Sequence, residues 1–203
     1  MLEVKIFTLY PDLFPGPLDG GIYKKSKENK VWDSRVINIR DYSTDGRGSV
    51  DDTPFGGGSG MLLRPDVVAS ALDKNTKSGE KIIYLSPKGK KFDQSEARSI
   101  SKLNKLNILC GHFEGIDQRL LETRNIEVYS IGDFILSGGE TASFVFVDAL
   151  LRLLPGVLGN EESNKEESFE NYLLEHPQYT KPKDWEGKSP PDILFSGDHA
   201  KIK

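Results

Sequence analysis

Cysteine is almost absent from this chain. Cys110 is the single thiol among 203 residues, which excludes an intrachain disulfide and a cysteine-rich zinc site. It stands in the apolar run LNILC, where a buried inert thiol is a better interpretation than a nucleophile. The three histidines, His112, His176 and His199, do not have the spacing of metal ligands, so we infer no zinc from them.

Long hydrophobic runs are also missing. The most apolar stretch, TASFVFVDALLRLL, is interrupted by Asp148 and Arg152 and is too short to cross a bilayer. The N-terminal MLEVKIFTLYPDLFPG lacks the basic start and the small-residue cleavage site of a secretory signal. A net charge of −4 at pH 7 does not by itself indicate a nucleic-acid partner. We therefore expect a cytoplasmic protein that makes no contact with a membrane.

The chain does contain apolar, β-branched runs that alternate with stretches of helical periodicity. Strands are expected at 4–10, 36–40, 81–86, 106–110 and 126–132, and helices at 64–74, 93–104, 117–124 and 140–154. This alternation predicts an α/β domain with a mainly parallel sheet. The pattern stops at LLPGVLGN (153–160), so we place the boundary between this domain and an appendage around 156–162.

Three of the expected strands are followed by polar, glycine-containing turns: YLSPKG (84–89), CGHFEGID (110–117) and SIGDFILSGGE (130–140). Any one of them could be a simple helix-capping turn. In an open parallel sheet, however, ligands bind beyond the carboxyl ends of the strands, so the three turns together indicate one shared pocket. Their backbone groups suit an adenine edge or a ribose, and none matches G-x-G-x-x-G or a P-loop.

Two further segments are candidates for function. The stretch DGRGSVDDTPFGGGSGM (45–61) is either a mobile, substrate-facing loop or a solvated linker. Because no P-loop lysine follows its glycines, a phosphoryl-transfer protein is a poor alternative. The acidic segment NKEESFENYLLEH, with Arg152 upstream, offers a carboxylate and a cation that could act as base and anion stabiliser, although an acidic run taken alone is more often a solvated face.

Six motifs, taken together and in order, resemble the bacterial tRNA (guanine-N1)-methyltransferases of the TrmD type. They are VDDTPFGGGSGM, YLSPKG, CGHFEGID, SIGDFILSGGE, LLPGVLGN and LLEHPQYTKP, and they lie in register across residues 5–200. The resemblance implies the SPOUT methyltransferase fold, which is a parallel sheet with helices on both faces and a deep C-terminal trefoil knot. Such a knot is an exception to the rule that chains do not thread loops.

The resemblance also implies S-adenosylmethionine as methyl donor and assigns residues to its site. The implied cofactor-binding residues are Leu85, Ser86, Pro87, Gly111, Glu114, Gly115, Ile131, Gly132, Asp133, Phe134, Ile135, Leu136, Gly138, Gly139, Ser168 and Glu175. The implied substrate-binding residues are Arg47, Asp51, Gly57 and Gly58.

The chemistry that the resemblance implies is methyl transfer to N1 of the guanosine immediately 3′ of the anticodon in tRNA. Arg152 matches an arginine that stabilises charge on O6, and Glu167 stands where the family has an aspartate base, with Glu166 as the alternative base. A magnesium ion is expected to assist, although no metal ligand is assigned. The family acts as a homodimer in which the acidic segment of one subunit closes over the cofactor of the other.

The expected domain organisation follows from the same comparison of motifs. A knotted methyltransferase domain is expected at 1–158, an acidic interdomain segment at 159–175, and the remnant of a C-terminal tRNA-binding domain at 176–203. Since the family's helical RNA-binding domain is expected to be largely absent, the alternative function is a cofactor-binding dimer impaired in catalysis.

Overall fold

A computed structural model describes residues 1–158 and 176–198 of the chain. The chain divides into two compact units, Met1–Asn164 and Lys165–Lys203, which are described separately. In the first unit the strands are β1 (Leu2–Thr8), β2 (Trp32–Asn38), β3 (Asp51–Asp52), β4 (Leu62–Leu63), β5 (Lys81–Lys91), β6 (Lys105–Leu109) and β7 (Glu127–Ser130). The helices are α1 (Gly21–Glu28), α2 (Pro65–Asn75), α3 (Gln94–Ile100), α4 (Gln118–Thr123) and α5 (Gly139–Leu151).

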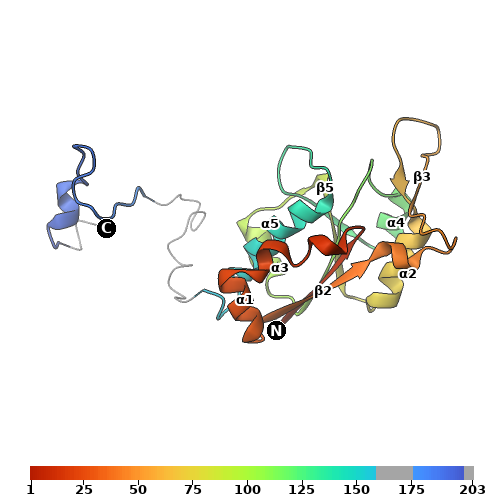
Figure 1. The fold of residues 1–203 in the computed structure, drawn as a ribbon, viewed down its shortest axis with the longest axis horizontal. Helices are drawn as coiled ribbons and strands as arrows, with labels where there is room; N and C mark the ends of the chain where they lie inside the picture. The colour runs from red at the N-terminus through yellow and green to blue at the C-terminus, as the bar shows by residue number, and fades with distance from the viewer. Residues whose placement is uncertain (159–175, 199–203) are drawn as a thin grey trace. The chain divides into compact units, whose positions relative to one another are not determined.

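Five strands form the central sheet of this unit, in the order β2-β1-β6-β5-β7 (Figure 1). Every neighbouring pair in this sheet is parallel, including β5 with β7 and β1 with β6. Because all five strands point the same way, their carboxyl ends meet along one edge of the sheet. The predicted α/β class with a mainly parallel sheet is therefore confirmed.

Side chains that alternate along the strands feed two separate hydrophobic clusters, one on each face of the sheet. Ile83 of β5 belongs to the first cluster, which also holds Phe146 and Leu150 of α5. Ile82, its neighbour in sequence, belongs to the second cluster, which holds Val68 and other residues of α2. Helices therefore cover both faces, with α3 and α5 over one and α2 and α4 over the other.

Local signals explain where several helices begin. Pro65 occupies the first turn of α2, where its missing N–H is not needed. The Asp93 side chain accepts a hydrogen bond of 3.0 Å from the Glu96 amide and so caps α3. The helix ends at Ile100, earlier than the expected 104, and is followed by a turn in which the Leu103 amide donates a hydrogen bond to the Ile100 carbonyl.

Three further features differ from the sequence-based expectation. β5 runs on through the expected turn at 84–89, because Lys90 and Lys91 pair again with β7 after a register shift between Leu85 and Lys90. The segment 45–61 has some regular structure, since β3 pairs with β4 as a short antiparallel ladder. The polar helix α1 was not predicted.

The described part of the second unit, residues 176–198, contains an isolated bridge between Trp185 and Lys188 and a short 3-10 helix at Asp192–Phe195. The Lys183 ammonium lies 4.4 Å from the centroid of the Phe195 ring. Within the described residues, no helix is both long enough and apolar enough to cross a membrane.

Candidate functional site

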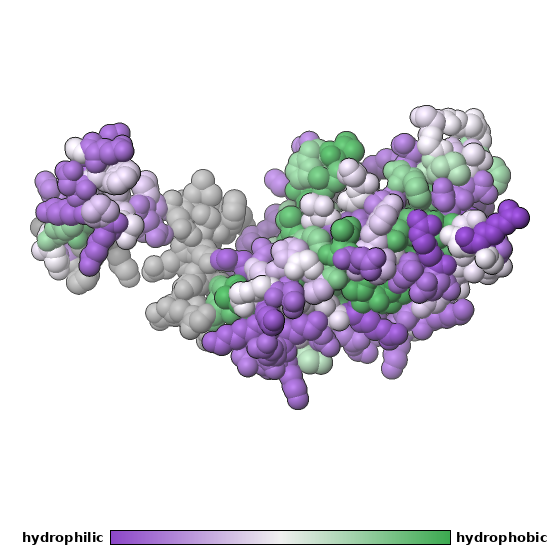
Figure 2. All heavy atoms as spheres, in the orientation of Figure 1, coloured by the Kyte–Doolittle hydropathy of each residue, from purple (hydrophilic) through white to green (hydrophobic). Residues whose placement is uncertain are grey.

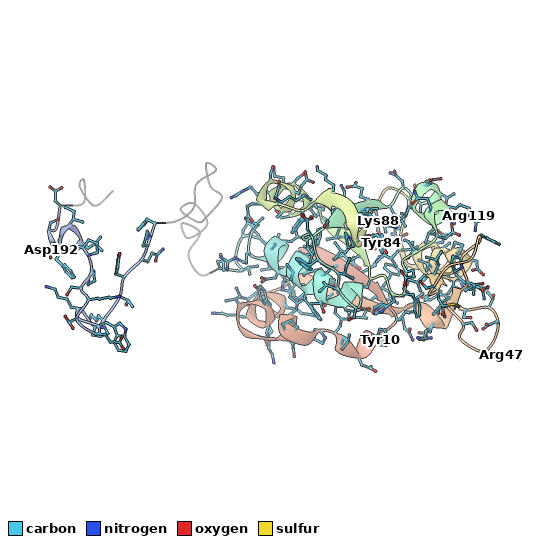
Figure 3. All side chains as sticks on the ribbon, turned by 90° about the horizontal axis from the view of Figure 1, so that it is seen from above. Tyr10, Arg47, Tyr84, Lys88, Arg119 and Asp192 are labelled. Atoms are coloured by element: carbon cyan, nitrogen blue, oxygen red, sulfur yellow. The ribbon has the colours of Figure 1, made fainter. Side chains whose placement is uncertain are left out.

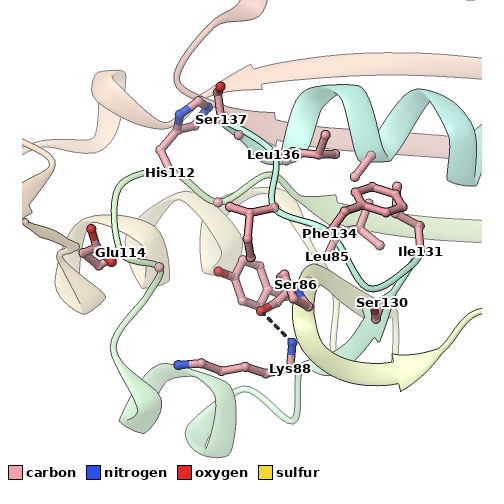
Figure 4. Close-up of a pocket in the computed structure, with 18 of the residues that line it drawn as sticks. Leu85, Ser86, Lys88, His112, Glu114, Ser130, Ile131, Phe134, Leu136 and Ser137 are labelled. Atoms are coloured by element: carbon pink, nitrogen blue, oxygen red, sulfur yellow. Dashed lines mark hydrogen bonds between the residues drawn. The ribbon is translucent and has the colours of Figure 1, made fainter.

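The three polar turns identified from the sequence meet at the carboxyl edge of the sheet and line a single cavity of about 300 Å³ (Figure 4). Each turn follows or interrupts a different strand: 84–88 in β5, 111–115 after β6 and 130–139 after β7. A volume of this order lies at the lower end of the range for small-molecule sites. The expected shared pocket is present.

Most of the residues that the resemblance assigned to the cofactor line this cavity. They are Leu85, Ser86, Pro87, Gly111, Glu114, Gly115, Ile131, Gly132, Phe134, Ile135, Leu136, Gly138 and Gly139. Asp133 is exposed and is not among the residues that line the cavity. Ser168 and Glu175 lie outside the described residues.

The cavity also has lining residues that sequence reasoning missed. They are Tyr84, Lys88, His112, Phe113, Ser130, Ser137 and Ala142. All but Ala142 lie within the three quoted motifs. Their position in sequence next to assigned residues is therefore the signal that could have identified them as cavity-lining residues. In the 84–88 turn, the Lys88 amide donates a hydrogen bond of 3.4 Å to the Ser86 hydroxyl (Figure 4). Burial raises the pKa of the Tyr84 phenol, and a hydrogen bond with Ser86 partly opposes that increase.

Two glycines allow the turns to approach one another. The Gly139 amide donates a hydrogen bond of 2.9 Å to the Gly111 carbonyl, which joins the start of α5 to the turn after β6. A Cβ atom at Gly139 would lie 2.7 Å from the Cα of Cys110, and one at Gly111 would lie 2.5 Å from the Tyr84 ring. Close packing against backbone atoms therefore requires glycine at 139, and a Cβ atom at 111 would have to displace the Tyr84 ring.

Cys110 is fully buried beneath this junction, as expected. Burial raises the pKa of its thiol, and the negative charge of Glu140 raises it further. Because the thiolate is the nucleophilic form, Cys110 is inert at neutral pH.

The wall of the cavity includes exposed apolar residues from the 131–138 loop. Phe134, Ile135 and Leu136 are 51%, 82% and 40% exposed. Figure 2 shows hydrophobic atoms where this loop projects from the upper part of the body. Apolar side chains beside polar backbone groups are the usual composition of a small-molecule site.

The four residues assigned to the substrate do not line this cavity. Arg47 is exposed and lies at one end of the body, away from Tyr84 and Lys88, which lie nearer its middle (Figure 3). Its amide and Ser49 donate hydrogen bonds to Asp45, which lower the pKa of that carboxyl. Asp51 is in the short strand β3, while Gly57 and Gly58 are exposed and have φ values of +81° and +127°.

The loop that carries these residues is nevertheless joined to the cavity. The Glu114 amide donates a hydrogen bond of 2.9 Å to the Met61 carbonyl, and the Leu63 amide donates one to Gly115. A Cβ atom at Gly60 would lie 2.4 Å from the Glu114 side chain. The end of the glycine-rich loop therefore packs against the turn that forms one wall of the cavity.

A second cavity of about 440 Å³ lies beside the same loop, lined in part by Phe55, Arg64 and Arg119. Each arginine forms an ion pair with a carboxylate close in sequence, Arg64 with Asp66 and Arg119 with Asp117. Neither Gly57 nor Gly58 lines it.

Arg152 caps the C-terminal end of α5, is partly buried and does not line the cavity. Asp148 lies one turn earlier, and burial raises the pKa of its carboxyl while the charge of Arg152 opposes that increase. The candidate bases Glu166 and Glu167 lie outside the described residues. No group of three or more His, Cys, Asp or Glu side chains that could hold a metal ion occurs in the described ranges.

Comparison with known proteins gives consistent results over the whole chain. A family model described as tRNA (Guanine-1)-methyltransferase TrmD matches residues 2–203. A tRNA (guanine-N(1)-)-methyltransferase of Pelagibacter ubique is 64% identical over 203 residues, which cover 100% of this chain and 89% of the relative. Proteins with the same name from Brucella canis and Rhodospirillum rubrum are 50% and 46% identical; the matches cover 98% and 99% of this chain, and 82% and 84% of those relatives.

Proposed function

This chain belongs to the tRNA (guanine-1)-methyltransferase family of the TrmD type, and from that premise we propose that it methylates N1 of the guanosine immediately 3′ of the anticodon in tRNA. The observation that carries the proposal is the match of the family model to residues 2–203, together with a cavity built from three of the six motifs. For a reaction on this substrate we also propose a cytoplasmic location.

We propose S-adenosylmethionine as the methyl donor and the cavity at the carboxyl edge of the sheet as its site. The residues present fit that molecule: Leu85, Ile131 and Leu136 offer apolar surface for a purine, and the glycine turns expose backbone groups that can bind its edge. When bound, the donor supplies a methyl group activated by its sulfonium. The protein then has to bind the donor, exclude water and align guanine N1 with the methyl carbon.

Two side chains are proposed to handle the charge that develops on guanine. Loss of the N1 proton moves negative charge toward O6, where the Arg152 guanidinium would stabilise it. Glu167 would accept that proton, and Glu166 is the alternative. The described residues offer no group that fits a magnesium ion, so we derive no step through one.

We also propose that the protein acts as a homodimer in which the acidic segment of one subunit completes the site of the other. Apolar surface at the middle of α5 and at the segment around Phe14 supports this assembly. Phe14 and Phe144 have ring centroids 4.8 Å apart, and their neighbours Leu13 and Val145 are each 52% exposed. For the segment between β5 and α5 we propose the trefoil knot of the family.

The reaction is tested by transfer of labelled methyl groups from S-adenosylmethionine to a tRNA transcript. The transcript carries G at the position 3′ of the anticodon, and a matched transcript carries A there. We expect label in the first transcript only. Binding of S-adenosylhomocysteine without any transfer, at protein and tRNA concentrations that offset weak RNA binding, would instead identify a cofactor-binding dimer that does not catalyse.

The two proposed chemical roles are tested by single-turnover kinetics with Arg152→Ala and Glu167→Ala. Both variants should lower the rate of the chemical step by about 100-fold or more, while binding of S-adenosylhomocysteine stays close to wild type. Glu166→Ala is the matched control and should retain most of the rate. If Glu166→Ala is the inactive variant, the base is Glu166.

A further inference from the structure

Glu140 is a buried carboxylate that the proposed chemistry does not use. It is only 3% exposed, and it does not line the cavity. One of its oxygens, Oε1, accepts a hydrogen bond of 2.5 Å from the Thr8 hydroxyl, and the other, Oε2, lies 2.7 Å from Nε2 of His112. Thr8 is fully buried and also lies outside the cavity lining.

The position of Glu140 explains why a charge is tolerated there. It lies in the first turn of α5, where the positive end of the helix dipole favours an anion. A buried carboxylate still has to be paired with donors to offset its lost hydration. The 2.7 Å contact between Oε2 of Glu140 and Nε2 of His112 is a hydrogen bond in which the imidazole N–H donates whenever the carboxylate is ionised.

The three side chains come from three segments that meet behind the cavity wall. Thr8 ends β1, His112 belongs to the turn after β6 and lines the cavity, and Glu140 begins α5 next to the 131–138 loop. The His112 ring lies at the edge of the cavity beside Ser137 (Figure 4). The Thr8 side chain is itself fixed in orientation, because its hydroxyl accepts a hydrogen bond of 2.9 Å from the Tyr10 amide.

These segments pack closely around Gly138. A Cβ atom at Gly138, which lines the cavity, would lie 2.3 Å from Cε1 of His112 and 2.7 Å from Oε2 of Glu140. On its other side His112 packs against Tyr10, with ring centroids 4.8 Å apart. The placement of the His112 ring therefore fixes the separation between the 111–115 turn and the 136–139 turn.

We propose that Thr8, His112 and Glu140 are positioning residues that hold these two turns at the separation the methyl donor requires. The inference rests on the proposed function, because it assigns the donor to this cavity. Thr8 and Glu140 act through His112 and Gly138, whereas His112 itself lines the cavity. Disrupting the hydrogen bonds should therefore weaken donor binding, even where the altered residue lies outside the cavity.

Thr8 offers the sharpest test, because it can be changed without altering the cavity lining. Thr8→Val removes the hydroxyl and keeps the shape of the side chain, whereas Thr8→Ser keeps the hydroxyl. Ile6→Val is a control at a buried position in the same strand. Affinity for S-adenosylhomocysteine is measured by calorimetry, and stability by thermal unfolding. We expect Thr8→Val to weaken binding about tenfold, consistent with the loss of one hydrogen bond to a charged group.

The other two variants separate positioning from general destabilisation. Thr8→Ser should bind within about twofold of wild type, and Ile6→Val should lose thermal stability without losing affinity. Equal affinities for wild type and Thr8→Val, with only a lowered melting temperature, would overturn the proposal. The glutamine side chain of His112→Gln can still donate a hydrogen bond to Glu140, whereas the leucine of His112→Leu cannot. We therefore expect His112→Gln to bind S-adenosylhomocysteine more tightly than His112→Leu.

Hydrogen exchange of the unliganded protein tests the same arrangement without any ligand. Thr8→Val and His112→Leu should speed exchange in 111–115 and 136–139, including the Gly139 amide, while β5 residues 81–85 stay protected. If wild type fails to bind S-adenosylhomocysteine, the donor assignment fails, and exchange alone decides whether these residues hold the turns. Unchanged exchange in both variants would overturn the positioning role whatever the donor is.

Discussion

At the scale of single residues, close approach of the backbone decides what the site tolerates. Gly139 should not accept even a methyl group, because a Cβ atom there would lie 2.7 Å from the Cα of Cys110 and 2.8 Å from the Gly111 amide nitrogen. Both neighbours are backbone atoms that cannot rotate away. We expect Gly139→Ala to lower the free energy of unfolding by about 3 kcal/mol, as overpacking does, and to abolish binding of S-adenosylhomocysteine.

Gly20→Ala is the matched control for this substitution. Its Cβ atom would meet only the Pro17 carbonyl at 3.5 Å, and Gly20 has a φ of −114° that any residue can adopt. Chemical unfolding of both variants checks the expectation. A Gly139→Ala variant as stable as Gly20→Ala would show that the 111–115 and 139 backbones can separate.

Which residues line the cavity could be predicted only in part, for a physical reason. The glycines and small polar residues of the turns can be recognised from local sequence, because glycine at the end of a strand indicates that other backbone or a ligand approaches closely there. Tyr84 and His112 looked like ordinary strand and turn residues. Their roles depend on which distant residue faces them, the Gly111 backbone for Tyr84 and the Glu140 carboxylate for His112, and periodicity does not report such pairs.

At the scale of elements, capping makes a prediction that is independent of function. The Asp93 carboxylate accepts a hydrogen bond of 3.0 Å from the Glu96 amide at the start of α3. Asp93→Ala should lower the free energy of unfolding by about 1 kcal/mol, and Asp93→Asn, which keeps an acceptor, by less than half of that. Urea unfolding measures both, and equal losses would mean that the side-chain acceptor at position 93 is not what stabilises the start of α3.

The elements themselves were predictable where their apolar pattern was strong. The five strands of the central sheet and helices α2 and α5 have runs whose buried faces are visible in the sequence. Helix α1 has only one buried residue, Ser26, so its pattern gave no signal. The extension of β5 to Lys91 arises from pairing with β7, which is a tertiary interaction that local sequence does not encode.

At the scale of the whole molecule, a charged cluster ties together the amino ends of the sheet strands. The Glu80 side chain is 9% exposed and lies 3.2 Å from Lys105 and 3.6 Å from Lys5. Burial alone would raise the pKa of Glu80, but hydrogen bonds from Lys105 and Asn107 lower it below the 4.5 of a free side chain. Its folded pKa is therefore lower than its unfolded pKa.

The sign of the resulting pH dependence follows from linkage. Stabilisation by ionised Glu80 is fully present above pH 4.5 and is lost as the pH falls through the folded pKa. We expect Glu80→Gln to cost about 2 kcal/mol at neutral pH and to flatten the decline in stability below pH 4.5. Asp73→Asn, which breaks an exposed ion pair with Arg124, should cost less than about 1 kcal/mol. Parallel pH profiles for wild type and Glu80→Gln would contradict the expectation.

Assembly is the other property at this scale, and complementation between two inactive subunits tests it directly. Ser86→Trp places a large ring in the cavity that we assign to the donor, and Glu167→Ala removes the proposed base. Each homodimer should be inactive. If the base of one subunit serves the cavity of its partner, a heterodimer of the two variants has one complete site, because the intact cavity meets the intact glutamate.

Co-expression with two different tags and sequential affinity purification would isolate that heterodimer. Its specific activity should be about half that of wild type, since one of two symmetry-related sites is intact. A heterodimer of wild type with the Ser86→Trp, Glu167→Ala double variant is the matched control. It contains the same four side chains, but each of its sites lacks one working component, so it should be inactive. The opposite ranking, with activity only in the control, would place cavity and base in the same subunit.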